Sequence, residues 1–373
     1  MNLQPIVSSQ YSWNASAGYR ACHLCMEPLE TAQENVSRLT GDPNVILPHM
    51  ESCATRNTFH VSCPYCGVEY CSKQCLEEAW NSFHATLCTR SNPPDPAHPL
   101  IQLDEIWKSI HYPPETASIQ LIARLLATLV QAETTEMRDS LAHKYQSFCH
   151  TATSDRENIC LKILGEKFVE PLERLRIATL QLFATKPDHI DWFLTPDGFI
   201  SLFALVGRNG QGIGTSSFAT WSKRVEKDVQ TKLPSSEAAN VDSLIDTIYA
   251  AIDSFAGLQF LNNEGTGLYV LHSKANHSCY PNAEVAFPFN NNELVLNATR
   301  SIEPGEEILI SYLECCDLDR SRHSRQKILR ENYLFACSCS KCTAESTDPD
   351  ITSDEEMESD EEDGDSEDDY NAG

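Results

Sequence analysis

Two cysteine-containing stretches in the C-terminal third decide the fold of this chain. They read Asn276-His277-Ser278-Cys279-Tyr280-Pro281-Asn282 and Cys337-Ser338-Cys339-Ser340-Lys341-Cys342. The second stretch places three thiols within six residues, whereas structural zinc takes four ligands in tetrahedral geometry. Cys279 is the best candidate for the fourth ligand. The adjacent pair Cys315-Cys316 could compete, but neighbouring residues rarely bind one ion comfortably, so we expect both to be small buried residues.

Four further pairs of potential metal ligands lie in the N-terminal quarter. They are Cys22-x2-Cys25, Cys63-x2-Cys66, Cys71-x3-Cys75 and His84-x3-Cys88. Each spacing lets two side chains reach one ion from a tight turn or a single helical turn. The four pairs therefore predict two sites of four ligands each; the alternative is a set of reduced, buried cysteines. We expect His49, Cys53 and His60, in the long segment between the first two pairs, to be non-ligands.

The charge and composition exclude several classes of protein. The 373 residues carry a net charge of −26, and the 15 acidic residues from Cys342 onward, without any Lys or Arg, leave −11 on the rest. The negative charge of the chain before Cys342 disfavours direct DNA binding, which needs a basic surface. No run approaches the ~18 apolar residues of a membrane span, and the N-terminus does not resemble a secretory signal. We therefore expect no membrane association and a cytoplasmic and nuclear location, where 16 cysteines indicate metal ligands rather than disulfides.

The pattern along the chain predicts six segments. They are residues 1–21, a zinc module at 22–88, a proline-rich linker and helical insert at 92–200, a strand-rich core at 201–314, a metal-binding segment at 322–342, and a disordered acidic tail at 345–373. Helices are expected from about 115, at 159–183 and at 241–255, and Leu121, Leu125, Leu126 and Leu129 form a core-facing stripe. Short strands are expected at 267–272, 283–287, 293–298 and 307–312. The Gly-rich run 209–214 lacks the preceding strand and the Lys-Ser/Thr of a phosphate loop.

These motifs resemble those of known families. The order Cys-Cys, Cys-Cys, Cys-Cys, His-Cys at 22–88 is similar to the MYND zinc finger, an interaction module. Three later motifs resemble those of a SET-domain lysine methyltransferase. The 276–282 motif and Gly305-Glu306-Glu307-Ile308 ending in Ser311-Tyr312 correspond to its core (201–314). The run Phe335-x-Cys337-x-Cys339-x2-Cys342 corresponds to its post-SET (322–342). The finger and the SET motifs together resemble the SMYD family. The run at 112–118, the loop at 207–217 and the acidic tail make the resemblance strongest to a divergent branch of that family.

The resemblance implies the fold and the roles of individual residues. The fold is α+β: a β-rich SET core interrupted by the finger and the helical insert, and closed by a zinc-bound post-SET. Zinc ligands would be grouped as Cys22, Cys25, Cys71 and Cys75; Cys63, Cys66, His84 and Cys88; and Cys279, Cys337, Cys339 and Cys342, giving about three ions. S-adenosylmethionine would contact Ser273, Asn276, His277, Phe335 and, on a looser alignment, Asn209, while Tyr312 would be the active-site tyrosine and also line the cofactor.

The expected activity is methyl transfer from S-adenosylmethionine to lysines of histones or ribosomal proteins. A narrow channel would desolvate the lysine and lower its pKa, and Tyr312 would align the amine. Expected partners are such basic proteins and a peptide partner of the finger. Residues 1–21 read as the remnant of an N-terminal SET segment, because they lack the Gly-x-Gly turn expected beside the cofactor. The alternative function is therefore a catalytically weak or inactive zinc-dependent adaptor, which cofactor binding would distinguish from the enzyme.

Overall fold

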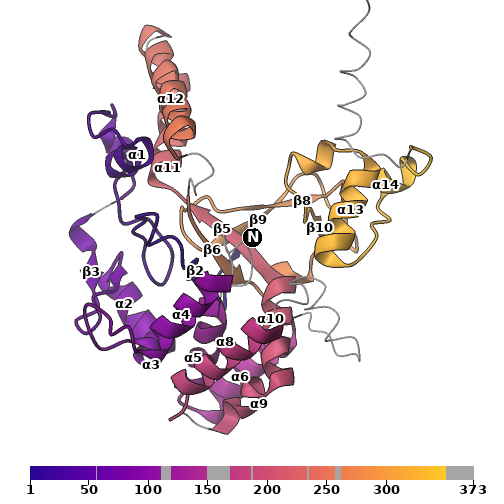
Figure 1. Ribbon diagram of the computed structural model, residues 1–373. Coiled ribbons are helices and arrows are strands. Elements are labelled where there is room, and N and C mark those ends of the chain that lie inside the picture. The colour runs from indigo at the N-terminus through magenta and orange to yellow at the C-terminus, as the bar shows by residue number, and fades with distance from the viewer. Residues whose placement is uncertain are drawn as a thin grey trace, which may run out of the picture. The chain divides into compact units, whose positions relative to one another are not determined.

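The computed structural model describes residues 1–55, 57–110, 119–148, 169–185, 188–232, 235–256 and 262–349. They form two compact units. The first unit comprises Met1–Ser273 and Ala286–Val295, and the second comprises Lys274–Val285 and the residues from Leu296 onward. Helices and short strands are mixed along the chain (Figure 1), which confirms the predicted α+β class.

A three-stranded antiparallel sheet in the first unit has the order β2-β6-β5. The central strand β6 (Asn263–Leu268) pairs with β2 (Val7–Gln10) on one side and with β5 (Gly210–Thr215) on the other. Gly265 is required at the centre, because a Cβ there would stand 2.3 Å from the carbonyl oxygen of Ser9. The N-terminal residues also supply β1 (Asn2–Leu3), which pairs with Leu294 and Val295 of β9 (Leu294–Ala298).

The strand β5 differs from the sequence-based expectation. The Gly-rich run 209–214 is not among the strands that the sequence predicts, which all follow residue 264. The structure pairs all six residues of β5 with β6, from Gly210 opposite Leu268 to Thr215 opposite Asn263. Backbone pairing with an already formed neighbour thus overrides a weak local preference.

A group of helices forms the main core of the first unit. It consists of α4 (Pro99–Ile110), α5 (Ile119–Gln131), α6 (Thr135–Gln146), α8 (Val169–Leu182), η5 (Asp188–Ile190), α9 (Asp191–Leu194) and α10 (Pro196–Asn209). The predicted leucine stripe of α5 is confirmed as core, since Leu121, Leu125 and Leu126 are fully buried and Leu129 nearly so. The expected helix start near 115, the run 112–118 and the first part of the helix expected at 159–183 lie outside the described residues.

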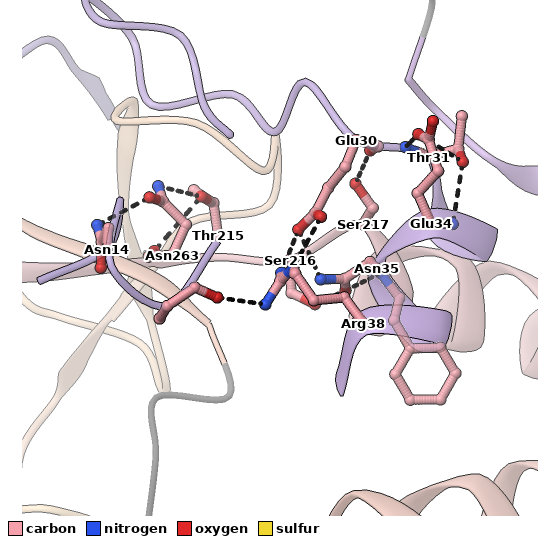
Figure 2. Close-up of polar contacts among 12 residues, drawn as sticks. Asn14, Glu30, Thr31, Glu34, Asn35, Arg38, Thr215, Ser216, Ser217 and Asn263 are labelled. Atoms are coloured by element: carbon pink, nitrogen blue, oxygen red, sulfur yellow. Dashed lines mark hydrogen bonds and ion pairs between the residues drawn. The ribbon is translucent and has the colours of Figure 1, made fainter. Parts of the chain in front are cut away.

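A second, smaller core joins α1 (Ala32–Thr40) to α11 (Ser217–Lys232) and α12 (Ser235–Ala256). Val36, Trp221 and Ile245 are among its buried residues, and α12 contains the helix predicted at 241–255. A polar network seats α1 on the start of α11 (Figure 2). In it, the side-chain amide of Asn35 donates to Oε1 of Glu30 at 2.7 Å, while its Oδ1 accepts from the backbone N–H of Phe218 at 3.2 Å.

The second unit is built from short strands and a helix that follow one another closely. β7 (Asn276–His277) pairs in parallel with β10 (Leu309–Ile310), and β8 (Ala283–Ala286) neighbours β9. After η7 (Asp317–Asp319) come α13 (Arg322–Tyr333) and α14 (Ser340–Ala344). Strands therefore occur within the runs predicted at 283–287, 293–298 and 307–312, whereas the run at 267–272 leaves β6 after Leu268 and enters η6 (His272–Lys274). Most of the predicted acidic tail lies outside the described residues.

Among the described helices, none combines the length and the apolar character that a membrane span requires.

Candidate active site and metal centres

The first metal cluster gathers ligands from two distant segments of the first unit. Ligand atoms of Cys22, Cys25, Cys71 and Cys75 all lie within 4.8 Å of one another. Cys71 follows β4 (Glu69–Tyr70), which pairs with β3 (Val61–Ser62), and Cys75 lies in the first turn of α2 (Lys73–Ala79). Ser72 caps this helix by accepting from the backbone N–H of Cys75 at 3.2 Å, which fixes the position of that thiol.

The loop that carries Cys22 and Cys25 is fastened to the rest of the first unit. The side-chain amide of Asn292 donates to Oγ of Ser8 at 2.7 Å and to the carbonyl of Leu24 at 3.2 Å, and the backbone N–H of Asn292 donates to the carbonyl of Cys25 at 2.7 Å. The hydroxyl of Thr215, on β5, donates to the carbonyl of Met26 at 2.9 Å. The loop of this metal cluster is therefore hydrogen-bonded to residues of the three-stranded sheet and to Asn292, and it does not stand apart from the rest of the first unit.

The second metal cluster combines Cys63, Cys66, His84 and Cys88, all of them buried. His84 ends η3 (Trp80–His84), a π-helical turn between α2 and α3 (Ala85–Leu87), and Cys88 directly follows α3. Nε2 of His84 lies 3.4 Å from Sγ of Cys66. Burial, with Arg124 and Arg90 nearby, lowers the pKa of His84 to about 4, so the ring is neutral at pH 7 as a metal ligand must be.

The third metal cluster lies in the second unit and joins Cys279 to Cys337, Cys339 and Cys342. Sγ of Cys279 lies 3.6 Å from Sγ of Cys342, and Cys342 sits in α14. The backbone of Cys337 is held by Gln326 of α13, which donates to its carbonyl at 2.6 Å and accepts from its N–H at 2.9 Å. All twelve residues thus fall into the three groups that the family resemblance implies.

Several cysteines and histidines that the sequence analysis considered lie outside these three clusters. His49, Cys53 and His60 belong to none of the three clusters among the described residues, and that they bind no metal stays a prediction. The thiol of Cys53 instead accepts from the backbone N–H of Ala32 at 3.3 Å. The expectation for Cys315 and Cys316 is wrong: both are exposed rather than buried, because they lie in the turn before η7 on the surface of the second unit.

Tyr312 is held in a defined orientation by its neighbours in the second unit. Its hydroxyl donates to the carbonyl of Ala275 at 2.8 Å, and its backbone N–H donates to Nδ1 of His277 at 3.0 Å. Its ring stands perpendicular to that of Phe335 at a centroid distance of 6.2 Å. Because the O–H is used toward Ala275, the phenolic oxygen can take part in a further hydrogen bond only as an acceptor.

The ring of His277 contacts two residues of the second unit. One ring nitrogen accepts from Tyr312, so the other carries the proton, and it lies 3.4 Å from Sγ of Cys279. Burial and then the charge of Arg325 lower the pKa of the His277 ring to about 4. The ring therefore connects the tyrosine to the third metal cluster, and a cofactor contact of its backbone stays a prediction.

The two asparagines that begin and end the 276–282 motif both bond toward β10. Asn276 lies at the exposed end of β7, and its side-chain amide donates to Oε1 of Glu307 at 2.6 Å. The side chain of Asn282 accepts from the backbone N–H of Leu309 at 2.8 Å and donates to the carbonyl of Glu307 at 2.8 Å. The motif thus fixes β7 against β10 through its asparagines.

Two of the predicted cofactor residues lie in the first unit. Ser273, at the end of that unit, is half-buried, and its hydroxyl donates to the carbonyl of Val270 at 3.0 Å. Asn209 is buried at the end of α10, where its amide donates to the carbonyl of Leu205 at 2.8 Å. The other four residues with this predicted role belong to the second unit, namely Asn276, His277, Tyr312 and Phe335. Cofactor contacts of these six residues stay predictions.

Tyr333 is a site residue that the sequence reasoning missed. Its ring centroid lies 5.0 Å from that of Tyr312, and its hydroxyl donates to the carbonyl of Tyr312 at 3.1 Å. Burial raises the pKa of Tyr333, so its hydroxyl keeps its proton at neutral pH. The available signal was its position two residues before Phe335, at the end of a helix that leads into the cysteine triplet.

Comparisons with known proteins place the chain in a family. The SET domain family model matches residues 62–313. Protein-lysine N-trimethyltransferase SMYD5 of Gallus gallus is 49% identical over 353 residues, which cover 95% of this chain and 82% of the relative. The human protein of that name is 49% identical over 354 residues, covering 94% of this chain and 82% of the relative. Histone-lysine N-methyltransferase SMYD3 of Mus musculus is 43% identical over 94 residues, 25% of this chain and 21% of the relative. With a SET domain over most of its length and such relatives, the chain belongs to the SMYD family of protein-lysine methyltransferases.

Proposed function

We propose that this chain transfers methyl groups from S-adenosylmethionine to lysine side chains of basic proteins, with histone tails and ribosomal proteins as the substrate class. The observation that carries the proposal is the fixed orientation of Tyr312, whose hydroxyl donates to Ala275 at 2.8 Å. The names of the relatives support it, because SMYD5 is called a trimethyltransferase of protein lysine and SMYD3 a histone methyltransferase. We extend the proposal to trimethylation on the same ground.

The residues around Tyr312 suit an in-line transfer to an amine. When bound, S-adenosylmethionine would supply a methyl group on a positively charged sulfur, and this sulfur would leave as a neutral thioether. The phenolic oxygen of Tyr312 accepts an N–H of the incoming lysine, which aims the lone pair of the amine. The rings of Tyr333 and Phe335 flank Tyr312, and such an apolar wall lowers the pKa of a lysine and so favours its neutral, nucleophilic form. The proton that the amine loses leaves to solvent.

We also propose that the three clusters bind zinc, about three ions in all. One cluster offers four thiols, the second offers three thiols and one imidazole, and the third offers four thiols. Such donor sets are those of closed structural zinc sites, which leave no position for substrate. The clusters would therefore hold the fold together rather than take part in methyl transfer.

The N-terminal module is proposed to be a MYND-type finger that binds a peptide partner. Tyr65, about half exposed, stacks on Trp80 at a centroid distance of 5.5 Å, and the guanidinium of Arg90 lies over both rings. Tyr65 is thus an accessible aromatic residue supported by a half-buried tryptophan, and such residues are common contacts in protein recognition. The proposal includes a cytoplasmic and nuclear location, and it excludes DNA and membranes from the set of partners.

Calorimetric titration of S-adenosylmethionine into the zinc-loaded full chain tests the enzymatic function. We expect saturable binding that Asn276→Ala weakens at least tenfold and that Asn297→Ala, an exposed asparagine on β9, leaves unchanged. Transfer of labelled methyl groups to core histones and to ribosomal proteins then identifies the substrate class, and mass spectrometry counts the methyl groups on each lysine. A folded, zinc-loaded chain without cofactor binding would contradict the enzyme and favour the adaptor.

A further inference from the structure

Arg124 is a buried cation that the proposed chemistry does not use. It lies in α5, within an unbroken run of buried residues from Leu121 to Ala127, and is only 4% exposed. Burial lowers the pKa of Arg124 to about 10, so the guanidinium still carries its charge at neutral pH. A charged group removed from water is costly unless an opposite charge lies nearby.

No carboxylate among the described groups supplies that opposite charge; the groups that favour the charged form of Arg124 are Tyr70 and Cys22, and Cys22 belongs to the first metal cluster. One terminal nitrogen donates to the backbone carbonyl of Ser8 on β2 at 2.7 Å, and the other lies 3.0 Å from Nδ1 of His23. The guanidinium also stands 4.6 Å above the ring of Phe83. Within the described part of the chain, no carboxylate lies at ion-pair distance from Arg124. A carbonyl, a neutral imidazole and a phenyl ring orient the cation but do not neutralise it.

Two of these contacts, to His23 and Phe83, place Arg124 beside residues of both metal clusters of the first unit. His23 lies in the loop between Cys22 and Cys25 of the first cluster, and its ring centroid is 5.4 Å from that of His84 in the second. Phe83 directly precedes His84. A divalent ion held by four thiolates carries a net charge of about −2, and one held by three thiolates and a neutral imidazole carries about −1. Both loaded clusters would therefore present negative charge in the surroundings of the guanidinium.

We propose that Arg124 is the internal counter-cation of the two metal centres in the first unit. The inference rests on the zinc proposal above. When the metals are bound, the anionic centres stabilise the buried charge and Arg124 ties them to α5 and β2. Removal of the metals takes apart both anionic centres, so the buried charge loses the groups that compensate it. Metal occupancy of the finger thus controls how firmly α5 and β2 are held.

Zinc release from the purified full chain tests the proposal. Metal analysis of the wild type comes first: a chain that retains no metal would contradict the zinc proposal itself. A coloured chelator then follows the release of each ion. We expect Arg124→Met, which keeps the volume and removes the charge, to release two of the three ions at least tenfold faster, while the third, in the second unit, leaves at the wild-type rate. Arg124→Lys, which keeps the charge, should stay close to the wild type.

Leu126→Ala is the matched control, since Leu126 is fully buried in the same helix but carries no charge. It should lower the melting temperature with and without metal. Arg124→Met should lower it only in the loaded chain and raise it in the stripped chain, because an uncompensated charge has been removed. Equal release rates for Arg124→Met and the wild type would overturn the proposal. So would equally fast release from Arg124→Lys or from Leu126→Ala. If the stripped chains do not melt cooperatively, the release rates decide.

Discussion

At the scale of single residues, the proposed chemistry depends on the hydroxyl of Tyr312. It has one donor and uses it toward Ala275, so what it offers a substrate is an acceptor. The backbone N–H of the same residue is fixed by His277, which in turn approaches the thiol of Cys279. Orientation of the tyrosine and integrity of the third metal cluster are therefore connected through one imidazole.

Replacing Tyr312 by Phe tests this role. We expect kcat for lysine methylation to fall about 100-fold, because the amine loses the oxygen that aims its lone pair. Cofactor affinity should change little, since the ring and its aromatic contacts remain. Tyr280→Phe is the matched control, because Tyr280 is 64% exposed. Steady-state kinetics with a methyl-accepting protein provides the measurement, and wild-type kcat in Tyr312→Phe would contradict the assignment.

His272 in the first unit makes stability depend on pH. It is buried, and among the described residues neither ring nitrogen has a hydrogen-bond partner. Burial lowers its pKa to about 4 in the folded chain, against about 6.5 when unfolded. Below pH ~6.5 the unfolded chain binds more protons than the folded one, so this contribution destabilises the fold as pH falls toward about 4 and vanishes above pH ~6.5.

At pH ~5.5, His272 is expected to lower the free energy of unfolding by about 1 kcal/mol relative to pH ~7.5. Urea unfolding of the wild type and of His272→Leu at these two pH values measures it, since the leucine variant lacks the titrating group. The variant should lose less stability on acidification than the wild type. Equal losses would show that the acid sensitivity arises elsewhere, for example in the metal-binding thiols.

At the scale of elements, the polar network of Figure 2 decides how α1 joins α11. Asn35 is completely buried and acts in both directions, donating to Glu30 and accepting from Phe218 and from the hydroxyl of Ser216 at 3.3 Å. Buried polar groups are tolerated when each has a partner, and removal of one member leaves the others unsatisfied.

Asn35→Ala should therefore destabilise the first unit by about 2 kcal/mol. Asn44→Ala is the control, because Asn44 is exposed and its side chain bonds only within the turn, to Asp42 at 2.9 Å. Chemical denaturation followed by tryptophan fluorescence is suitable, since Trp221 lies in the adjoining core. A variant as stable as Asn44→Ala would show that the network does not hold the helices together.

At the scale of the whole molecule, the three metal clusters are distributed over both units. Two of them lie in the first unit and one in the second, within the described residues. Because structural zinc supplies folding free energy outright, each unit is expected to depend on its own metal.

Metal analysis of the intact chain should give about three zinc ions, and Cys279→Ser should lose one of them. Cys53→Ser should keep all three, because Cys53 belongs to no cluster among the described residues. A wild-type content near two would remove one centre from the proposal. Loss of more than one ion from Cys279→Ser would mean that the units do not hold their metals independently.

The sequence by itself determined the family, the ligand pairs and the mixed class of the fold. Ligand spacings such as Cys22-x2-Cys25 and Cys71-x3-Cys75 are local, because a tight turn or one helical turn suffices to aim both side chains. Which pairs share an ion depends on contacts between distant segments, and here the family resemblance, rather than spacing, supplied the grouping that the structure shows.

Only the tertiary structure decided the remaining features. In the sequence, Arg124 merely interrupts an apolar run, and its place beside residues of two metal clusters requires α5, β2 and the finger to be packed together. Gly210–Thr215 becomes a strand because β6 is available to pair with it. Tyr333 reaches Tyr312 only because α13 is folded back against the strand end, and the exposure of Cys315 and Cys316 follows from a surface turn. Each of these depends on long-range packing and on access to solvent, which local sequence patterns do not encode.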